Sequence, residues 1–180
     1  TIVWYDRKCY FNEGDYKIVE KLEELDEISD LIGLYIFDEF EFDLNKIKKY
    51  NLEQLRIENT DKIIFCDLND NIKSLIINYC CLVYAPVLPK DLIELDLSNN
   101  FIEGLDEIEI PNSLKRINLN DNHIKVLNID SESIRTIYAC NNYISSIKKI
   151  PQKLKKLFLN NNYIEFNSED FATYKGTIIM

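Results

Sequence analysis

An eleven-residue pattern recurs along the chain at nearly constant spacing. Four consecutive segments fit LxxLxLxxNxI and begin at residues 92, 114, 134 and 154: LIELDLSNNFI, LKRINLNDNHI, IRTIYACNNYI and LKKLFLNNNYI. Three weaker matches begin at residues 72, 52 and 31, namely IKSLIINYCCL, LEQLRIENT and LIGLYIFDE. A unit that recurs every 20–22 residues cannot bury its own apolar face, so we expect seven stacked coils that share one continuous core.

The order of apolar and polar residues within each unit predicts a short strand followed by a turn. Apolar and polar residues alternate around positions four and six, so Leu95 and Leu97 should point into the core. The ninth position turns the chain away and leaves backbone groups that need hydrogen-bond partners in the interior. An asparagine amide both donates and accepts. We therefore expect a structural ladder at this position: Asn100, Asn122, Asn142 and Asn162.

Proline adds a second regularity. Pro89, Pro111 and Pro151 each lie three residues before the first apolar position of a unit, where proline favours extended backbone over helix. Together with LxxLxLxxNxI, these prolines resemble the leucine-rich-repeat family over residues 31–166, in the short-repeat class of bacterial effectors and some large DNA viruses. The resemblance implies an α/β leucine-rich-repeat solenoid. Such a solenoid is a gently curved, right-handed horseshoe with about seven parallel strands on its concave face. Its convex side is non-helical, and helix is found mainly in the end caps.

Both ends of such a stack need covers, because a solenoid exposes its core there. Residues 1–30 are predicted to form an N-terminal cap, with a hairpin in TIVWYDRKCYFN and a helix that Asp15 begins. The apolar face of that helix would hold Tyr16, Val19, Leu22 and Leu25. Residues 167–180 are predicted to form a C-terminal cap, with a short helix from Ser168. The apolar end, Ile178 to Met180, should pack onto this cap or mark where a longer chain was cut.

Residues that carry chemistry are few and poorly placed for catalysis. The single histidine, His123, occupies a variable position beside the ladder, so it forms no Ser/His/Asp or Cys/His arrangement. With four glycines, the chain has no phosphate-cradling loop. The five cysteines include the adjacent pair Cys80 and Cys81 and lack the spacing of a zinc site. The acidic cluster lacks the spacing of a calcium loop: Glu103, Asp106, Glu107 and Glu109. We therefore expect no enzyme activity, no cofactor and no metal.

The residues that the core leaves free should line the concave face of the sheet. Several of them are large and apolar, and exposed apolar side chains on an ordered sheet usually mark an interaction surface. Tyr35 and Phe37 have an alternative, which is burial under the N-terminal cap. We expect a partner to contact eight residues of this face: Tyr138, Phe158, Tyr79, Ile76, Arg116, Arg135, Lys155 and Lys156.

Three functions are open at this point. The first is a non-catalytic protein–protein interaction module that binds through the concave face. The second is a binder of single-stranded nucleic acid, because residues 111–180 hold ten bases against six acids. The third is a structural repeat region of a larger polypeptide. The net charge of −10 opposes general attraction to nucleic acid or anionic lipid, so a protein partner is favoured over nucleic acid.

The cysteines and the start of the sequence indicate the cellular setting. An odd number of cysteines without a disulfide framework favours a reducing, intracellular (cytoplasmic) location. For a pathogen protein this could be the host cytoplasm. The first residues lack the basic start and long apolar run of a signal peptide. No stretch approaches the roughly 18–20 apolar residues that span a bilayer. We expect a monomer that does not bind membranes.

Overall fold

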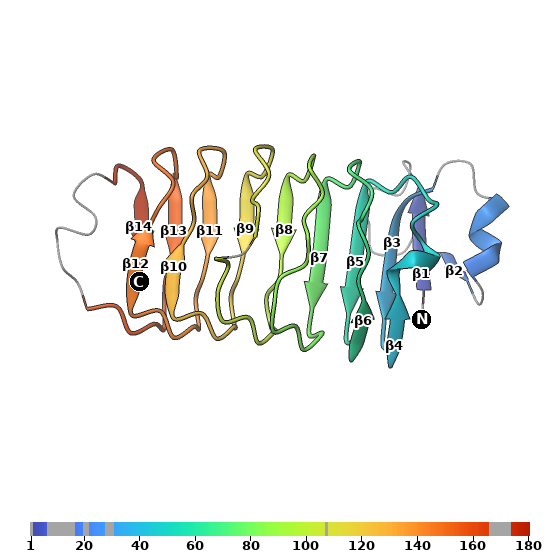
Figure 1. The fold of residues 1–180 in the computed structure, drawn as a ribbon, viewed down its shortest axis with the longest axis horizontal. Coiled ribbons are helices and arrows are strands. Elements are labelled where there is room, and N and C mark those ends of the chain that lie inside the picture. The colour runs from blue at the N-terminus through green and yellow to red at the C-terminus, as the bar shows by residue number, and fades with distance from the viewer. Residues whose placement is uncertain (1, 7–16, 20–21, 28–30, 107, 166–173) are drawn as a thin grey trace.

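The computed structural model describes residues 2–6, 17–19, 22–27, 31–106, 108–165 and 174–180. Their strands lie side by side in one long row (Figure 1), in a ten-stranded sheet of order β14-β13-β11-β9-β8-β7-β5-β3-β1-β2. The repeat strands are β3 (Leu31–Phe37), β5 (Gln54–Glu58), β7 (Ser74–Asn78), β8 (Glu94–Asp96), β9 (Arg116–Asn118), β11 (Thr136–Tyr138) and β13 (Lys156–Phe158). Each of these strands pairs with its neighbour in parallel. The predicted solenoid of about seven parallel strands is confirmed.

Equivalent positions of successive repeats lie directly beside one another in the core. At position four, Leu95 pairs in register with Ile117, Ile117 with Ile137, and Ile137 with Leu157. Each of these side chains is at most 2% exposed. Burying one such side chain stabilises the fold by about 1.5–3 kcal/mol, so these rows supply much of the driving force for folding.

The ladder asparagines satisfy the backbone where each coil leaves its strand. Asn122 is 3% exposed. Its Oδ1 accepts from the Ile102 amide at 3.0 Å, and its Nδ2 donates to the Leu97 carbonyl at 2.9 Å, both in the preceding repeat. Three other asparagines also bridge two repeats in this way: Asn100, Asn142 and Asn162. Each amide therefore fastens one coil to the coil before it.

The eighth position of every repeat adopts left-handed backbone. Its φ values lie between 48° and 59° at Asp38, Asn59, Tyr79, Asn99, Asp121, Asn141 and Asn161. Asparagine and aspartate tolerate this conformation because their short polar side chains bond to nearby groups, whereas bulky residues are strained there. Six of the seven repeats follow this preference, and Tyr79 departs from it. The turn directs the eighth side chain away from the open face of the sheet, so the strand alternation ends at position seven.

The return wall behind the sheet is extended rather than α-helical in the part of the chain that the structure describes. Short parallel pairs form there between β4 (Glu41–Asp43) and β6 (Lys62–Ile64), and between β10 (Val126–Asn128) and β12 (Ser146–Lys149). A single 3-10 turn, η2 (Leu44–Lys46), begins after Asp43, whose side chain accepts from the Asn45 amide. A repeat of about 20 residues leaves no room for a longer helix.

Before the first repeat, the chain adds two strands and a short helix. β1 (Ile2–Asp6) pairs antiparallel with both β2 (Lys17–Val19) and β3. The sequence pattern predicted helix at Lys17–Val19, and this detail is wrong, because the edge of β1 offers backbone hydrogen bonds to that segment. The helical segment begins later, as the 3-10 helix η1 (Leu22–Glu27), with Leu25 1% exposed. Asp15 and the strand predicted near Tyr10 lie outside the described residues.

The apolar C-terminal segment continues the sheet. β14 (Thr177–Ile179) pairs in parallel with β13, with Leu157 opposite Ile178 and Phe158 opposite Ile179. Ile178 is half-buried and packs against the core, whereas Ile179 is 38% exposed. The segment therefore behaves as an eighth parallel strand, which neither alternative from the sequence described. The helix predicted from Ser168 lies outside the described residues.

Candidate interaction surface

Three apolar side chains meet on the open face of the sheet near its C-terminal end. Tyr138, Phe158 and Ile179 hold the same register on β11, β13 and β14. The Tyr138 and Phe158 rings stack, with centroids 4.7 Å apart and planes 14° from parallel. Both rings are half-buried. We call these three residues the open-face patch.

Basic residues flank the open-face patch, but they differ in how free they are. Lys155 and Lys156 are exposed and have no ion-pair partner among the described residues. Arg116 forms an ion pair with Glu94 at 2.9 Å. Arg135 is half-buried, and its Nη1 donates to three backbone carbonyls, at Glu132, Ser133 and Ile134. The Arg135 side chain thus stabilises the loop that precedes β11. Lys155 and Lys156 are the accessible charges beside the patch.

The middle of the open face is occupied by side chains that bond to one another. Ile76 lies between Arg56 and Asp96 in the strand register and is half-buried. Asp96 accepts from the Asn118 side chain at 2.9 Å and from the Ser98 amide at 2.9 Å. Asp96 and Asn118 lie in register between Ile76 and Tyr138, so this hydrogen-bonded pair separates Ile76 from the open-face patch.

The N-terminal end of the open face carries a bonded cluster. The Tyr35 hydroxyl donates to Glu58, which also pairs with Arg56 at 2.6 Å. The Arg56 guanidinium lies 4.7 Å from the centre of the Tyr35 ring, and the centre of the Phe37 ring lies 4.8 Å from it with the two ring planes tilted by 31°. Burial raises the pKa of Tyr35 to about 12, and the hydrogen bond to Glu58 acts in the same direction. Tyr35 and Phe37 are half-buried, and this cluster is better explained by packing than by binding.

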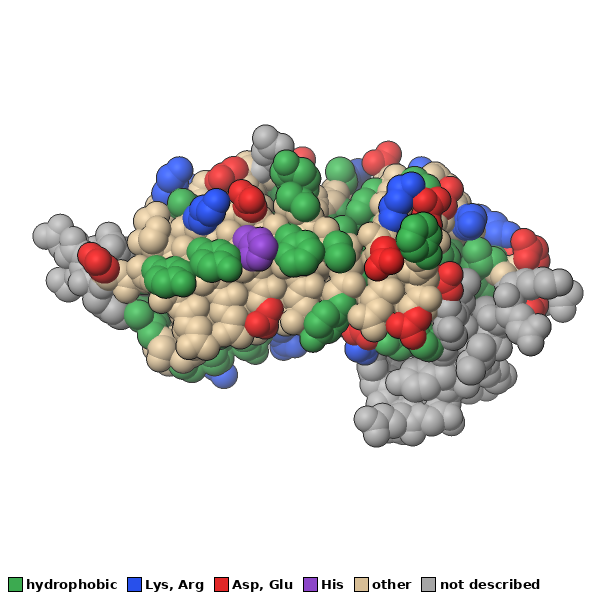
Figure 2. All heavy atoms as spheres, turned by 90° about the horizontal axis from the view of Figure 1, so that it is seen from below, with side chains coloured by type: hydrophobic (Ala, Val, Ile, Leu, Met, Phe, Trp, Pro, Cys, Tyr) green, Lys and Arg blue, Asp and Glu red, His purple; other side chains and the backbone are tan. Residues whose placement is uncertain are grey.

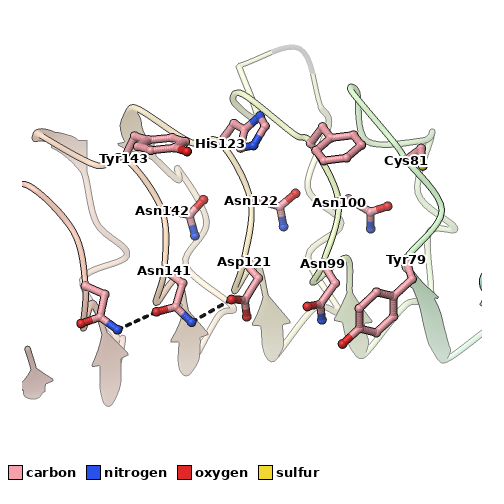
Figure 3. Close-up of a pocket in the computed structure, with 12 residues that line it drawn as sticks. Tyr79, Cys81, Asn99, Asn100, Asp121, Asn122, His123, Asn141, Asn142 and Tyr143 are labelled. Atoms are coloured by element: carbon pink, nitrogen blue, oxygen red, sulfur yellow. Dashed lines mark hydrogen bonds between the residues drawn. The ribbon is translucent and has the colours of Figure 1, made fainter.

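Tyr79 does not lie on the open face, contrary to the prediction. It follows the end of β7 in left-handed backbone, so the turn carries its side chain to the edge where the coils leave the sheet. We call this edge the turn edge. Figure 3 shows Tyr79 in one row with Asn99, Asp121 and Asn141 of later repeats. The prediction counted position eight as part of the open face, but the left-handed backbone at this position turns the side chain away from that face.

The turn edge holds a shallow groove of about 610 Å³. One side is a row of side chains from position ten of the repeats: Cys81, Phe101, His123 and Tyr143, with Tyr163 following Tyr143 at 6.1 Å. The other side is the row from position eight. Figure 2 shows a line of hydrophobic side chains along this edge, with the histidine in its middle. The residues predicted to bind a partner do not include this position-ten row. A signal was present in the sequence, since position ten is aromatic or histidine in five of the seven repeats, counting Phe40.

The described residues hold no group of three or more histidines, cysteines or acids that could bind a metal. His123 lies between Phe101 and Tyr143, at ring distances of 5.3 and 5.4 Å, rather than beside a nucleophile. Burial raises the pKa of Cys80 to about 11, so this thiol is a poor nucleophile at neutral pH. Among the described residues, no helix is long and apolar enough to cross a bilayer.

Comparison with known proteins agrees with this architecture. A family model described as Leucine Rich Repeat matches residues 91–112. The solved structure of YopM from Yersinia enterocolitica WA-314 is similar, with a TM-score of 0.55 and 28% sequence identity; the match covers 62% of this chain and 25% of that chain. This chain therefore matches about a quarter of the length of that relative, and no curated protein matches the sequence. Leucine-rich repeats generally serve as scaffolds for protein interaction. The matched repeat, the solved relative and the stacked coils together show a leucine-rich-repeat solenoid built from short repeats.

Proposed function

We propose that this chain is a non-catalytic interaction module that binds a protein partner through the open-face patch. The observation that carries the proposal is the alignment of Tyr138, Phe158 and Ile179 in one register. Beside them lie the exposed Lys155 and Lys156, for which the described part of the chain offers no ion-pair partner. Stacked aromatic rings offer a large contact area at a low cost in side-chain entropy, and such residues are frequent hot spots of binding. The chemistry favours an acidic segment that carries at least one large apolar side chain.

Several of the remaining bases of this end form ion pairs, which weakens the nucleic-acid alternative. Lys149 pairs with Asp130, and Lys153 lies 3.8 Å from Glu132. Lys125 lies 3.6 Å from Glu103. A strip that grips a phosphate backbone needs several unpaired cations in sequence.

A displayed library of random peptides, selected on the folded chain, tests the proposal. We expect enrichment of acidic peptides with an apolar residue. Tyr138→Ala and Phe158→Ala should each weaken their binding by more than about 1 kcal/mol while the melting temperature changes little. Tyr84→Ala removes a tyrosine that is 78% exposed and distant in sequence, and it serves as the matched control. Selected peptides that bind equally to the Tyr138→Ala chain would overturn the proposal.

A second measurement separates the protein and nucleic-acid functions. Reversing Lys155 and Lys156 to glutamate should slow the association of an acidic peptide, and the effect should fade as salt rises. A fluorescent single-stranded oligonucleotide at about 50 mM salt is the competing probe, because weak screening favours electrostatic binding. Micromolar or tighter oligonucleotide binding that is lost on charge reversal would replace the protein-partner proposal.

A further inference from the structure

The turn-edge groove combines two parallel rows of different chemistry. The first row is aromatic, and Phe101, Tyr143 and Tyr163 are 47%, 47% and 65% exposed. The second row presents amides and one carboxylate: Asn99, Asp121, Asn141 and Asn161. Exposed aromatic side chains in a continuous line are unusual on a surface that has no covering partner. The two rows therefore need a common explanation.

The rings of the aromatic row follow one another at similar distances and remain partly exposed. The Tyr143 and Tyr163 planes are 5° from parallel, yet their centroids are 6.1 Å apart. The His123 ring is tilted by 35° from the Phe101 ring and by 50° from the Tyr143 ring, so the row is a line of neighbouring rings and not one flat surface. His123 continues the row at 5.4 Å from Tyr143, and Phe101 follows at 5.3 Å from His123. The row therefore holds four rings at similar spacing but with different tilts.

The amide row is held in place by its own hydrogen bonds. Asn161 donates from Nδ2 to the Asn141 Oδ1 at 2.7 Å, and Asn141 donates to Asp121 at 2.8 Å. Each amide nitrogen still has a second hydrogen, and the oxygens still have unused lone pairs. The inner asparagines of the groove bond to backbone and stay structural. The outer row is therefore a regular line of donors and acceptors beside an apolar platform.

We propose that the turn-edge groove is a second binding site, which takes an extended, uncharged, β-linked saccharide chain. The C–H-rich faces of pyranose rings pack on the negative faces of aromatic rings, and their hydroxyls bond to amides and carboxylates. The ring spacings of 5.3 to 6.1 Å are comparable to the length of one pyranose residue in a straight chain. The four rings thus correspond to four consecutive sugar subsites.

Other ligands fit the groove less well. Among its lining residues there is no lysine or arginine and one acid, Asp121, so a nucleic acid or an anionic polysaccharide finds no counter-charge. An extended polypeptide advances about 3.3 Å per residue, so its same-side residues recur at about 6.6 Å, which is longer than the 5.3 and 5.4 Å spacings on either side of His123. A neutral saccharide matches both the spacing and the charge.

Titration calorimetry of the whole chain with β-1,4-linked glucose and N-acetylglucosamine oligomers of two to six residues tests this site. We expect the dissociation constant to fall with oligomer length up to the tetramer and then to level off. Tyr143→Ala and Tyr163→Ala should each weaken tetramer binding at least tenfold, Tyr143→Phe should retain it, and Asn141→Ala should weaken it severalfold. Tyr84→Ala, outside the groove, should bind like the parent.

Three outcomes would contradict the saccharide proposal. No heat change with either tetramer at about 5 mM would overturn the proposal, since that concentration detects binding far weaker than a specific site gives. Binding that survives both Tyr143→Ala and Tyr163→Ala would place the saccharide elsewhere and also overturn it. Uncharged peptides that bind in a Tyr143-dependent way, without saccharide binding, would assign the groove to a polypeptide. Thermal melts of each variant, followed by circular dichroism, establish that the compared proteins are folded.

Discussion

Single side chains decide whether adjacent coils stay joined, and Asn122 gives the clearest case. It is 3% exposed and bonds to backbone groups in both its own coil and the preceding one. Asn122→Ala would leave buried backbone groups unpaired, and we expect it to lower the free energy of unfolding by about 1–3 kcal/mol. Urea denaturation followed by circular dichroism measures the loss. An Asn122→Ala chain that unfolds at the parent's urea concentration would show that these bonds add nothing.

Tyr79 is a residue that the fold tolerates rather than prefers. Its φ of 54° lies in the left-handed region, which costs a bulky L-residue about 1–2 kcal/mol. Its side chain is 57% exposed, so little packing is lost on replacement. We expect Tyr79→Asn to raise the free energy of unfolding by about 1 kcal/mol, and the reverse change, Asn99→Tyr, to lower it by a similar amount. Equal stabilities of parent and Tyr79→Asn in urea would refute strain at this turn.

Cys80 links stability to alkaline pH. Its pKa rises from 9.0 to about 11 because of burial, and its thiol donates to the Asn78 carbonyl. A raised pKa in the folded chain means that the stabilisation is complete below pH 9 and is lost as pH rises toward about 11. Cys80→Thr removes the titrating group and keeps the bond that Thr60 makes at the same repeat position. We expect the parent to lose stability relative to Cys80→Thr between these pH values, as measured by urea midpoints. Parallel pH profiles would contradict the linkage.

Some residues could be placed correctly from the sequence, and others could not. Leu95 and Asn122 could be assigned from spacing alone, because the repeat period fixes which side chains face the core. Tyr79 could not, since the repeat period does not show where a side chain points once the strand ends; the asparagine or aspartate at position eight of six repeats was the available signal for a left-handed turn. Val19 lies at helical spacing from Leu22, yet the edge of β1 pairs with its strand, which is a tertiary effect. The sequence also does not show that Lys156 is exposed whereas Arg135 donates to backbone carbonyls, because this difference depends on local contacts in the folded chain.

At the scale of elements, β14 extends the sheet and completes the open-face patch. Ile178 packs against the core, and Ile179, one residue later, lies on the opposite face beside Phe158. We expect Ile178→Asp to lower the free energy of unfolding by about 2 kcal/mol or more, since it buries a carboxylate among apolar side chains. Ile179→Asp should cost less than half as much because that side chain is 38% exposed. Chemical denaturation of both variants gives the comparison, and equal losses would show that β14 does not alternate as described.

The two faces of each coil supply two kinds of surface from one repeat. Position five of the strand faces the open side and holds Tyr138 and Phe158, whereas positions eight and ten form the turn edge. Because the coils repeat, the side chains at a given position of successive coils form a row along the molecule. The strands and ladder thus fix the spacing of both surfaces, and the identity of the side chains sets what each can bind.

At the scale of the whole molecule, the described coils form one continuous row, and charge is distributed unevenly along the chain. Its net charge is −10, yet residues 111–180 carry ten bases against six acids, and the open-face patch lies in this part. An acidic partner is therefore repelled by most of the surface and attracted to one end, which favours a single docking orientation. We propose that the C-terminal end of the sheet contacts a protein through the open-face patch.

Site-specific photo-crosslinking in the native cell tests that claim most directly. A benzophenone amino acid at position 138 keeps an aromatic ring in the open-face patch, and the same amino acid at position 84 samples an exposed site outside it. The account predicts a protein adduct at position 138 and none at 84. Excess parent chain should compete with adduct formation, and the Tyr138→Ala, Phe158→Ala double variant should not. An adduct at position 84 alone, or nucleic acid in place of protein at position 138, would contradict the account.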